Sequence, residues 1–237
     1  GIVESMIPES IRSIIDSNII ESISISFDDK NTGYISKKSD LIYGKKLIKK
    51  YDCVLIGSGL DEDLRSIKFA SNIIKSSRKK IVIDGSGLLS LSNNHLTIEE
   101  LPTNTIMTPH YYEFSKIFGI DVELVKYNPI DVVSSIIPQL GGRVLILKGP
   151  TTIIVNSKGE ILLLDNGSEI LSTAGTGDVL AGIVSSLSSQ GYSIDSASII
   201  GTWIHGDCSR KYILQNGMYG LTASKLIDYI SVSLNSL

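Results

Sequence analysis

The sequence predicts an α/β fold of three layers, αβα, with a mostly parallel sheet and an antiparallel strand extension toward its C-terminal side. Three observations support this fold class. Short apolar runs alternate with segments of helical period over the first part of the chain. After residue 143, strand-like runs follow one another directly, and long helical patterns then close the chain.

The alternating part contains six strand candidates, at residues 1–6, 22–27, 52–57, 80–84, 104–107 and 143–148. After the first of them, Pro8 stands at a plausible first helical position, and Ile11, Ile14 and Ile15 form an inward apolar stripe. After the third, a Gly-Ser-Gly turn leads into a helix near 61–77. This order is typical of βαβ units in one parallel sheet.

The later part predicts a hairpin and a helical end. Residues 152–156 and 160–164 are apolar and strand-like, and Ser157-Lys158-Gly159 between them forms the turn. Helical patterns follow over 177–190, 195–215 and about 221–233.

Size and composition favour one domain over residues 1–237. Hydrophobic residues make up 42% of the chain, enough for a full core without cross-links. Cys53 and Cys208 both lie in apolar patterns, so we expect reduced core thiols. The chain starts at Gly1 inside a strand-like run, so we also expect that sequence precedes it.

The charge pattern and the apolar runs exclude some partners. The 22 basic and 25 acidic residues are interspersed, without the basic stripe that a nucleic-acid binder uses. No apolar run reaches membrane-spanning length, and no leader opens the chain. We therefore expect a soluble, cytoplasmic protein with a small-molecule partner.

The most informative motif is Gly175-Thr176-Gly177-Asp178, which follows a strand-like run and opens a long apolar helix. Its small residues can expose backbone N–H groups at a helix N-terminus, where the helix dipole favours an anion such as phosphate. Asp178 can then accept a proton from a hydroxyl beside that phosphate. The alternative interpretation is a tight turn with an acidic residue that complements the dipole.

Further polar residues follow other predicted strands. In open α/β sheets, loops at strand C-termini line the ligand crevice, so Asp84, Gly59 and the residues after Met107 should gather at one edge. His110 and Glu113 fall within one helical turn and can face the same rim, or they can simply cap the helix. Lys148 ends an apolar strand. A lysine at such a position is usually solvated, and the alternative interpretation is that it contacts a phosphate.

The remaining histidines give no metal pattern. His205 and Asp207 lie in a helical segment at a spacing that is not typical of metal ligands, so packing or helix-surface roles are expected. His95 reads as a loop residue, and no His/Cys cluster indicates zinc.

In their order, several of these segments resemble the successive motifs of the NAD(P)H-hydrate dehydratases, which belong to the ribokinase-like superfamily. The similarity covers nearly the whole chain. The segments are residues 56–60, 83–85, 108–110 with Glu113, 147–149, 174–183, 204–207 and 220–228.

The resemblance implies repair of a hydrated, inactive nicotinamide cofactor. ADP or ATP phosphorylates the hydroxyl of hydrated NADH or NADPH, and phosphate then leaves as the ring double bond forms. Asp178 would accept the hydroxyl proton, Gly59 and His110 would contact the hydrate, and Glu113 would orient a Mg²⁺-bound water. The implied nucleotide-binding residues are Lys148, Gly149, Pro150, Thr151, Thr152, Gly175, Thr176 and Gly177. A homo-oligomer, a tetramer or larger, is also implied.

The chain departs from the family pattern at several loops. Ser58 stands where the family usually has proline, Asp61 where it has glycine, and Tyr111-Tyr112 where it has Pro-Gly. Gly85-Ser86-Gly87 replaces a stretch with a second carboxylate, and residues 168–171 replace an Asn-Pro-Gly-like segment. The family's first strand and Gly-rich loop have no counterpart here.

Two other functions are compatible with the same residues. A ribokinase-like kinase acting on a thiazole or pyrimidine alcohol would use the same anion loop and Asp178. A nucleotide-binding protein without catalysis would be consistent with the departures at Asp61, Gly85 and Tyr111-Tyr112.

Overall fold

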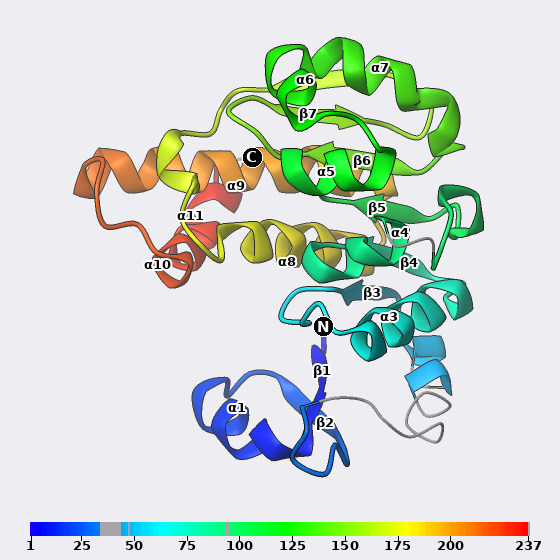
Figure 1. The fold of residues 1–237 in the computed structure, drawn as a ribbon. Coiled ribbons are helices and arrows are strands. Elements are labelled where there is room, and N and C mark those ends of the chain that lie inside the picture. The colour runs from blue at the N-terminus through cyan, green and yellow to red at the C-terminus, as the bar shows by residue number, and fades with distance from the viewer. Residues whose placement is uncertain (34–43, 47, 93–94, 237) are drawn as a thin grey trace.

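The computed structural model describes residues 1–33, 44–46, 48–92 and 95–236. A six-stranded sheet in the order β3-β4-β5-β6-β7-β8 forms the centre of the molecule (Figure 1). Its strands are β3 (Cys53–Ile56), β4 (Lys80–Ile83), β5 (Thr105–Met107), β6 (Val144–Leu147), β7 (Thr152–Val155) and β8 (Ile161–Leu164).

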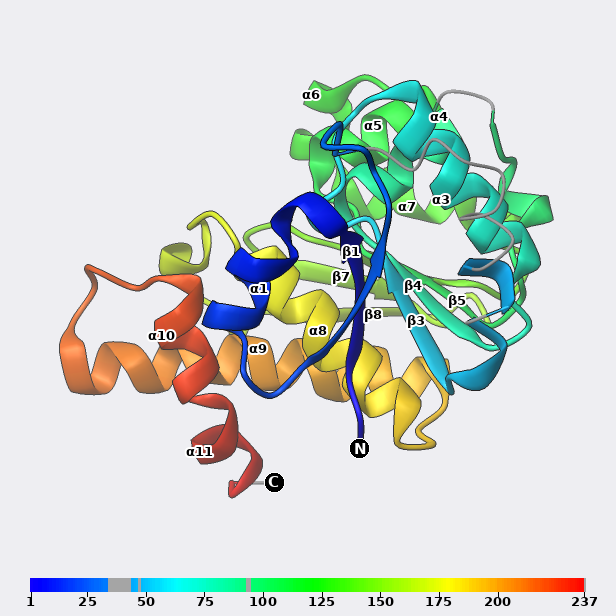
Figure 2. The same ribbon diagram turned by 90° about the horizontal axis from the view of Figure 1, so that it is seen from below.

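Helices cover both faces of this sheet (Figure 2). Those on one face are α3 (Leu64–Ser76), α4 (Leu89–Ser92), α5 (Tyr111–Phe118), α6 (Val122–Tyr127) and α7 (Pro129–Leu140). Those on the other are α8 (Thr176–Ser189), α9 (Ile194–Asn216) and α10 (Ala223–Asp228), followed by α11 (Ile230–Leu234). The predicted three-layer fold is confirmed.

The sequence of β4 accounts for its place inside the sheet. Ile81 and Ile83 point into the core beneath α3–α7, whereas Val82 points into the core beneath α8–α10. All three side chains are fully buried. An uninterrupted apolar run of this kind is required where helices cover both faces of a parallel strand.

The parallel and antiparallel parts of the sheet also follow the prediction. Strands β3 to β6 pair in parallel, whereas β6–β7 and β7–β8 pair antiparallel. The hairpin turn lies at residues 157–159, where the Gly159 amide donates to the Asn156 carbonyl and Gly159 has φ +81°. Glycine adopts this left-handed conformation without a steric penalty.

The N-terminal segment corrects the prediction of one continuous parallel sheet. β1 (Glu4–Pro8) and β2 (Ile23–Phe27) pair with each other in a separate two-stranded parallel sheet, with α1 (Arg12–Asn18) between them. Tyr51, just before β3, hydrogen-bonds the Glu4 carboxylate of β1. Apolar alternation identified the strands, but it carries no information on which strands pair.

The predicted inward stripe after β1 is also wrong. Ile11 and Ile14 are 39% and 60% exposed, and Ile15 is only half-buried. Pro8 ends β1 and precedes a 3₁₀ turn at Glu9–Ile11, so it does not occupy the first position of an α-helix. α1 lies against β2, but Ile11 and Ile14 remain exposed there and join neither hydrophobic core.

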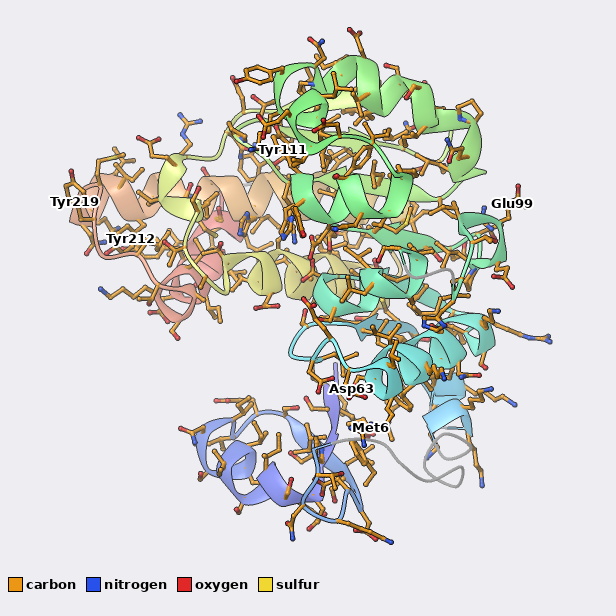
Figure 3. The ribbon with its side chains drawn as sticks, viewed as in Figure 1. Met6, Asp63, Glu99, Tyr111, Tyr212 and Tyr219 are labelled. Atoms are coloured by element: carbon orange, nitrogen blue, oxygen red, sulfur yellow. The ribbon has the colours of Figure 1, made fainter. Side chains whose placement is uncertain are left out.

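Helix boundaries depend on local capping. α3 begins later than predicted because the Asp63 side chain accepts a hydrogen bond from the Arg65 amide at 2.8 Å (Figure 3). The last predicted helix is divided in two at Tyr229, whose amide bonds back to the Leu226 carbonyl in a tighter turn.

The two cysteines are unpaired, as predicted. Cys53 is half-buried and Cys208 is buried. Burial raises the pKa of the Cys53 thiol to about 11, which makes it a weak nucleophile at neutral pH. Among the described residues, no helix is both long enough and apolar enough to cross a membrane.

Candidate functional site

The carboxyl ends of four neighbouring strands bring polar groups to one edge of the sheet. Gly57, Asp84, Thr108 and Lys148 each follow directly on β3, β4, β5 and β6. The loop at Gly57 lies very close to the loop after β4. A Cβ atom at Gly57 would stand 1.7 Å from the Asp84 carbonyl oxygen, and the backbone of Gly57 has a φ of +120°. Only glycine permits this approach.

Asp84 is the centre of a buried polar cluster at that edge. The residue is 3% exposed. Its Oδ1 accepts hydrogen bonds from Thr108 Oγ1 at 2.6 Å and from Lys148 Nζ at 2.8 Å, and its Oδ2 accepts from Ser58 Oγ at 3.3 Å. A buried carboxylate requires such donors, so this cluster is a firmly held part of the fold.

His110 and Glu113 form a reciprocal cap at the start of α5. The His110 amide donates to Glu113 Oε2 at 2.7 Å, and the Glu113 amide donates to His110 Nδ1 at 3.1 Å. The capping interpretation of this motif is thus observed. The cap leaves the His110 ring exposed and places the Glu113 carboxylate 4.0 Å from Lys148 Nζ.

Lys148 is not the solvated strand-end lysine that is the default for its position. Its side chain is 20% exposed and lies between the carboxylates of Asp84 and Glu113. The ammonium also reaches the first turn of α8, since a Cβ atom built on Gly177 would lie 3.3 Å from Nζ. The fold thus brings together a cation, a buried carboxylate and a helix N-terminus.

The loop before α8 has the geometry expected of an anion site. Gly175 precedes the helix with φ +86°, a conformation that favours glycine. Thr176 is buried, and its hydroxyl donates to the Leu171 and Thr173 carbonyls at 2.5 and 2.8 Å. Asp178, in the first turn of the helix, is exposed to solvent. Its carboxylate is therefore accessible to a hydroxyl of a bound molecule.

His205 belongs to this region, although its spacing predicted only a packing or surface role. It is buried in α9, and its Nε2 lies 2.9 Å from the Thr176 carbonyl oxygen, so it donates to the first turn of α8. Burial lowers the pKa of His205 to about 4, which keeps the ring neutral. Residue spacing alone does not connect His205 to the loop before α8, because the two lie on different helices.

The titration of His205 predicts a pH dependence of stability. The unfolded chain takes up a proton near pH 6.5, whereas the folded chain resists it until about pH 4. The free energy of unfolding should therefore fall by about 2 kcal/mol between pH 7 and pH 5 and gain nothing from this group above pH 7. Urea unfolding at a series of pH values measures this slope.

The variant His205→Gln keeps an N–H donor but does not titrate. The decrease in the free energy of unfolding that His205 causes between pH 7 and pH 5 should therefore disappear. His95→Gln, at a half-buried loop histidine, is the matched control and should retain it. Equal slopes in the two variants would show that His205 is not the group responsible.

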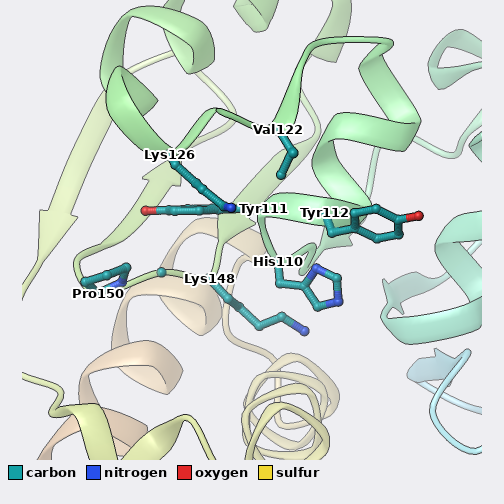
Figure 4. A pocket seen from close by; sticks show the side chains of 8 residues that line it. His110, Tyr111, Tyr112, Val122, Lys126, Lys148 and Pro150 are labelled. Carbon is teal, nitrogen blue, oxygen red and sulfur yellow. The ribbon is translucent and has the colours of Figure 1, made fainter. Parts of the chain in front are cut away.

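A pocket of about 390 Å³ opens beside Lys148 (Figure 4). Its lining residues are His110, Tyr111, Tyr112, Val122, Lys126, Lys148, Gly149 and Pro150. The Tyr111 ring packs on Gly149, where a Cβ atom would stand 2.3 Å from the tyrosine oxygen. The pocket offers apolar and aromatic walls with Lys148 at one side, a lining suited to a ring that carries anionic groups.

The structure brings together only part of the predicted site residues. His110, Lys148, Gly149 and Pro150 line the pocket, and Gly177 lies beside Lys148. The other predicted residues do not line it: Gly59, Glu113, Thr151, Thr152, Gly175, Thr176 and Asp178. The sequence placed Asp84 at this edge but assigned it no role.

Comparison with known proteins decides the family. The model of the family described as NAD(P)H-hydrate dehydratase matches residues 9–232. The chain belongs to this family. The fold is ribokinase-like. It matches the ADP/ATP-dependent NAD(P)H-hydrate dehydratase of Bacillus subtilis with a TM-score of 0.79 and 20% identity, over 100% of this chain and 81% of that one.

Relatives in the NAD(P)H-hydrate dehydratase family differ in length from this chain. It is 31% identical to a bifunctional NAD(P)H-hydrate repair enzyme of Dictyoglomus turgidum, over 100% of this chain and 46% of the relative. It is 27% identical to an ADP-dependent (S)-NAD(P)H-hydrate dehydratase of Lactococcus lactis, over 97% of this chain and 78% of the relative. The chain therefore spans less than half the length of the bifunctional relative.

Proposed function

We propose that this chain catalyses the ADP- or ATP-dependent dehydration of hydrated NADH or NADPH. The observation that carries the proposal is the position of Lys148, whose ammonium lies between the pocket and the first turn of α8. The Lys148 ammonium can thus contact both a phosphate at the N-terminus of α8 and a ring bound in the pocket. The name of the Lactococcus lactis relative supports ADP as co-substrate, and the Bacillus subtilis protein was crystallised with ATP and Mg²⁺.

In this proposal the adenine nucleotide lies along two loops. Lys148 to Thr152 and Gly175 to Gly177 bind it, with the terminal phosphate at the N–H groups of the first turn of α8. Gly59, His110 and Asp178 contact the hydrate. The exposed positions of Gly59, His110 and Asp178 leave these residues accessible to a ligand.

The chemistry proceeds in two steps. Asp178 accepts the proton of the hydrate hydroxyl as that oxygen bonds to the terminal phosphorus, and the bond from this phosphorus to the nucleotide's bridging oxygen breaks. The phosphorylated ring then loses phosphate from carbon and a proton from the neighbouring carbon, which forms the double bond. Phosphate is a good leaving group and hydroxide a poor one, so the first step makes the second possible. With ADP the products are AMP, phosphate and the restored cofactor.

A magnesium ion fits the charges of this site. The carboxylates of Asp84 and Glu113 lie beside Lys148, Asp178 is in the first turn of α8, and the nucleotide adds further negative charge. The described residues include no group of three side chains that could hold a metal ion by themselves. This agrees with Mg²⁺ held mainly by water and phosphate oxygens, with Glu113 orienting one water. The ion would neutralise phosphate charge.

The proposed function is tested by following NADH absorbance after ADP and Mg²⁺ are added to hydrated NADH. We expect absorbance to rise only when nucleotide and protein are both present. A stable phosphorylated product would instead favour the small-molecule kinase, and nucleotide binding without turnover would favour the non-catalytic protein. Replacing ADP by ATP, and the NADH hydrate by the NADPH hydrate, determines which substrates are used.

Assembly and location are further parts of the proposal. The resemblance to the family supports a homo-oligomer, a tetramer or larger, that acts in the cytoplasm on soluble cofactors. Light scattering of the purified chain measures its mass, and a monomer would contradict the proposed assembly.

A further inference from the structure

The buried carboxylate of Asp84 has no part in the proposed chemistry, yet it holds the cation on which that chemistry depends. We propose that Asp84 is a positioning residue, which anchors the Lys148 ammonium at the first turn of α8 before any nucleotide binds. This inference rests on the proposed function only for the identity of the nucleotide.

The contacts of Asp84 show an anchor made from several loops. Asp84 follows β4, Thr108 follows β5 and Lys148 follows β6, and all three meet at Oδ1 of the carboxylate. Ser58, after β3, donates to Oδ2. Thr108 is fully buried and Asp84 is 3% exposed, so neither can rotate away without leaving an unpaired polar atom. The carboxylate therefore has one fixed position.

Electrostatics explains why Lys148 requires this anchor. The N-terminus of a helix carries partial positive charge, and it repels an ammonium. Without a counter-ion the flexible lysine side chain would turn toward solvent. Asp84 compensates the repulsion at 2.8 Å, and Glu113 adds a weaker attraction at 4.0 Å.

The anchor also orients the remaining donors of Lys148. An ammonium has three N–H groups. In the part of the chain that the structure describes, the Lys148 ammonium donates one hydrogen bond, to Asp84. The other two N–H groups can donate hydrogen bonds to phosphate oxygens beside Gly177. Asp84 thus fixes the position of the Lys148 ammonium and leaves two of its three N–H groups available to a bound anion.

The first test needs no nucleotide. An amine-reactive reagent labels lysines at rates that depend on their accessibility, and mass spectrometry measures each rate. In Asp84→Asn the Lys148 amine loses its counter-ion, so we expect its labelling to become about tenfold faster. Lys75, paired with Glu100 at 2.8 Å but 44% exposed, is the internal control and should not change.

Two comparisons make the labelling test decisive. Thr108→Val removes a hydrogen bond to Asp84 but keeps its charge, so it should accelerate labelling of Lys148 less than Asp84→Asn does. In the wild-type chain, labelling of Lys148 as fast as that of Lys75 would overturn the inference. This comparison uses only the wild-type chain, so it can be made even if Asp84→Asn does not fold.

The second test is ADP binding, measured by calorimetry. Asp84→Asn should weaken ADP binding about tenfold, and Lys148→Met should weaken it at least as much. Because Asp84 acts through Lys148, the double variant should bind ADP no more weakly than Lys148→Met alone. Losses that multiply, or tighter binding in Asp84→Asn, would overturn the inference.

The outcomes separate the two proposals. A chain that shows these effects on ADP binding but restores no NADH contradicts the proposed function alone. A chain that restores NADH while Asp84→Asn leaves labelling and ADP binding unchanged contradicts the positioning role alone. A chain that binds neither ADP nor ATP contradicts the proposed function, and the labelling test then decides the positioning role by itself.

Discussion

Replacing Asp178 by asparagine should lower kcat by about 10²- to 10⁴-fold while ADP affinity stays within about twofold of wild type. The side chain keeps its size but can no longer accept the hydroxyl proton. Asp178 is exposed in the first turn of α8, so its loss leaves no unpaired buried group. The effect should therefore fall on the chemical step and not on folding.

The measurement combines NADH restoration with calorimetric ADP binding in the same protein. Asp131→Asn is a suitable control, because Asp131 is also an exposed acid in the first turn of a helix, α7, and belongs to none of the proposed binding segments. It should leave kcat unchanged. Activity of Asp178→Asn within a few-fold of wild type would exclude Asp178 as the proton acceptor, and parallel loss of ADP binding would point to a binding role instead.

The second large effect concerns Gly57. Gly57→Ala should lower the free energy of unfolding by about 3 kcal/mol, because it adds left-handed backbone strain to overpacking. The new Cβ would stand 1.7 Å from the Asp84 carbonyl oxygen and 2.6 Å from the Gly87 nitrogen. Both contacts are backbone atoms, which cannot turn aside as a flexible side chain can.

Gly59→Ala separates the two causes. Gly59 also has a left-handed φ, +74°, but its missing Cβ would meet nothing within 4 Å. It should therefore cost only the strain, about 1 kcal/mol. Equilibrium unfolding in denaturant measures both variants. Equal losses would mean that the close approach of the two loops is unimportant for stability.

The substitution at Gly57 should also weaken ADP binding at the candidate site. Any shift of the Asp84 backbone moves the carboxylate that holds Lys148. We expect folded Gly57→Ala to bind ADP more weakly than Gly59→Ala at temperatures where both are native. This outcome would link the tight loop contact to the position of the cation.

Much of the local structure, in the site and elsewhere, was predictable because its signals are local. The glycines before α8, the cap formed by His110 and Glu113, and the turn at Gly159 depend on residues within a few positions of each other. Each motif encodes its own backbone geometry, so spacing alone predicted the structure around it. Strand ends could likewise be predicted, because polar residues follow buried apolar runs.

The contacts that convert these motifs into one site were not predictable in the same way. Asp84 and Lys148 are 64 residues apart, and His205 is 29 residues from the carbonyl it supports. Neither pair has a sequence pattern in common. The separate pairing of β1 with β2 was missed for a related reason, because a strand's own residues do not specify its neighbour.

By itself, the sequence determined the three-layer alternation of strands and helices, the antiparallel extension, and the glycine-containing loop before α8, because periodicity and turn chemistry act over short stretches of chain. Only the tertiary structure decided that Asp84 binds Lys148 at that loop and that His205 supports it from a neighbouring helix. Such contacts arise when distant segments pack into one core, and their free energy depends on burial that no single segment provides.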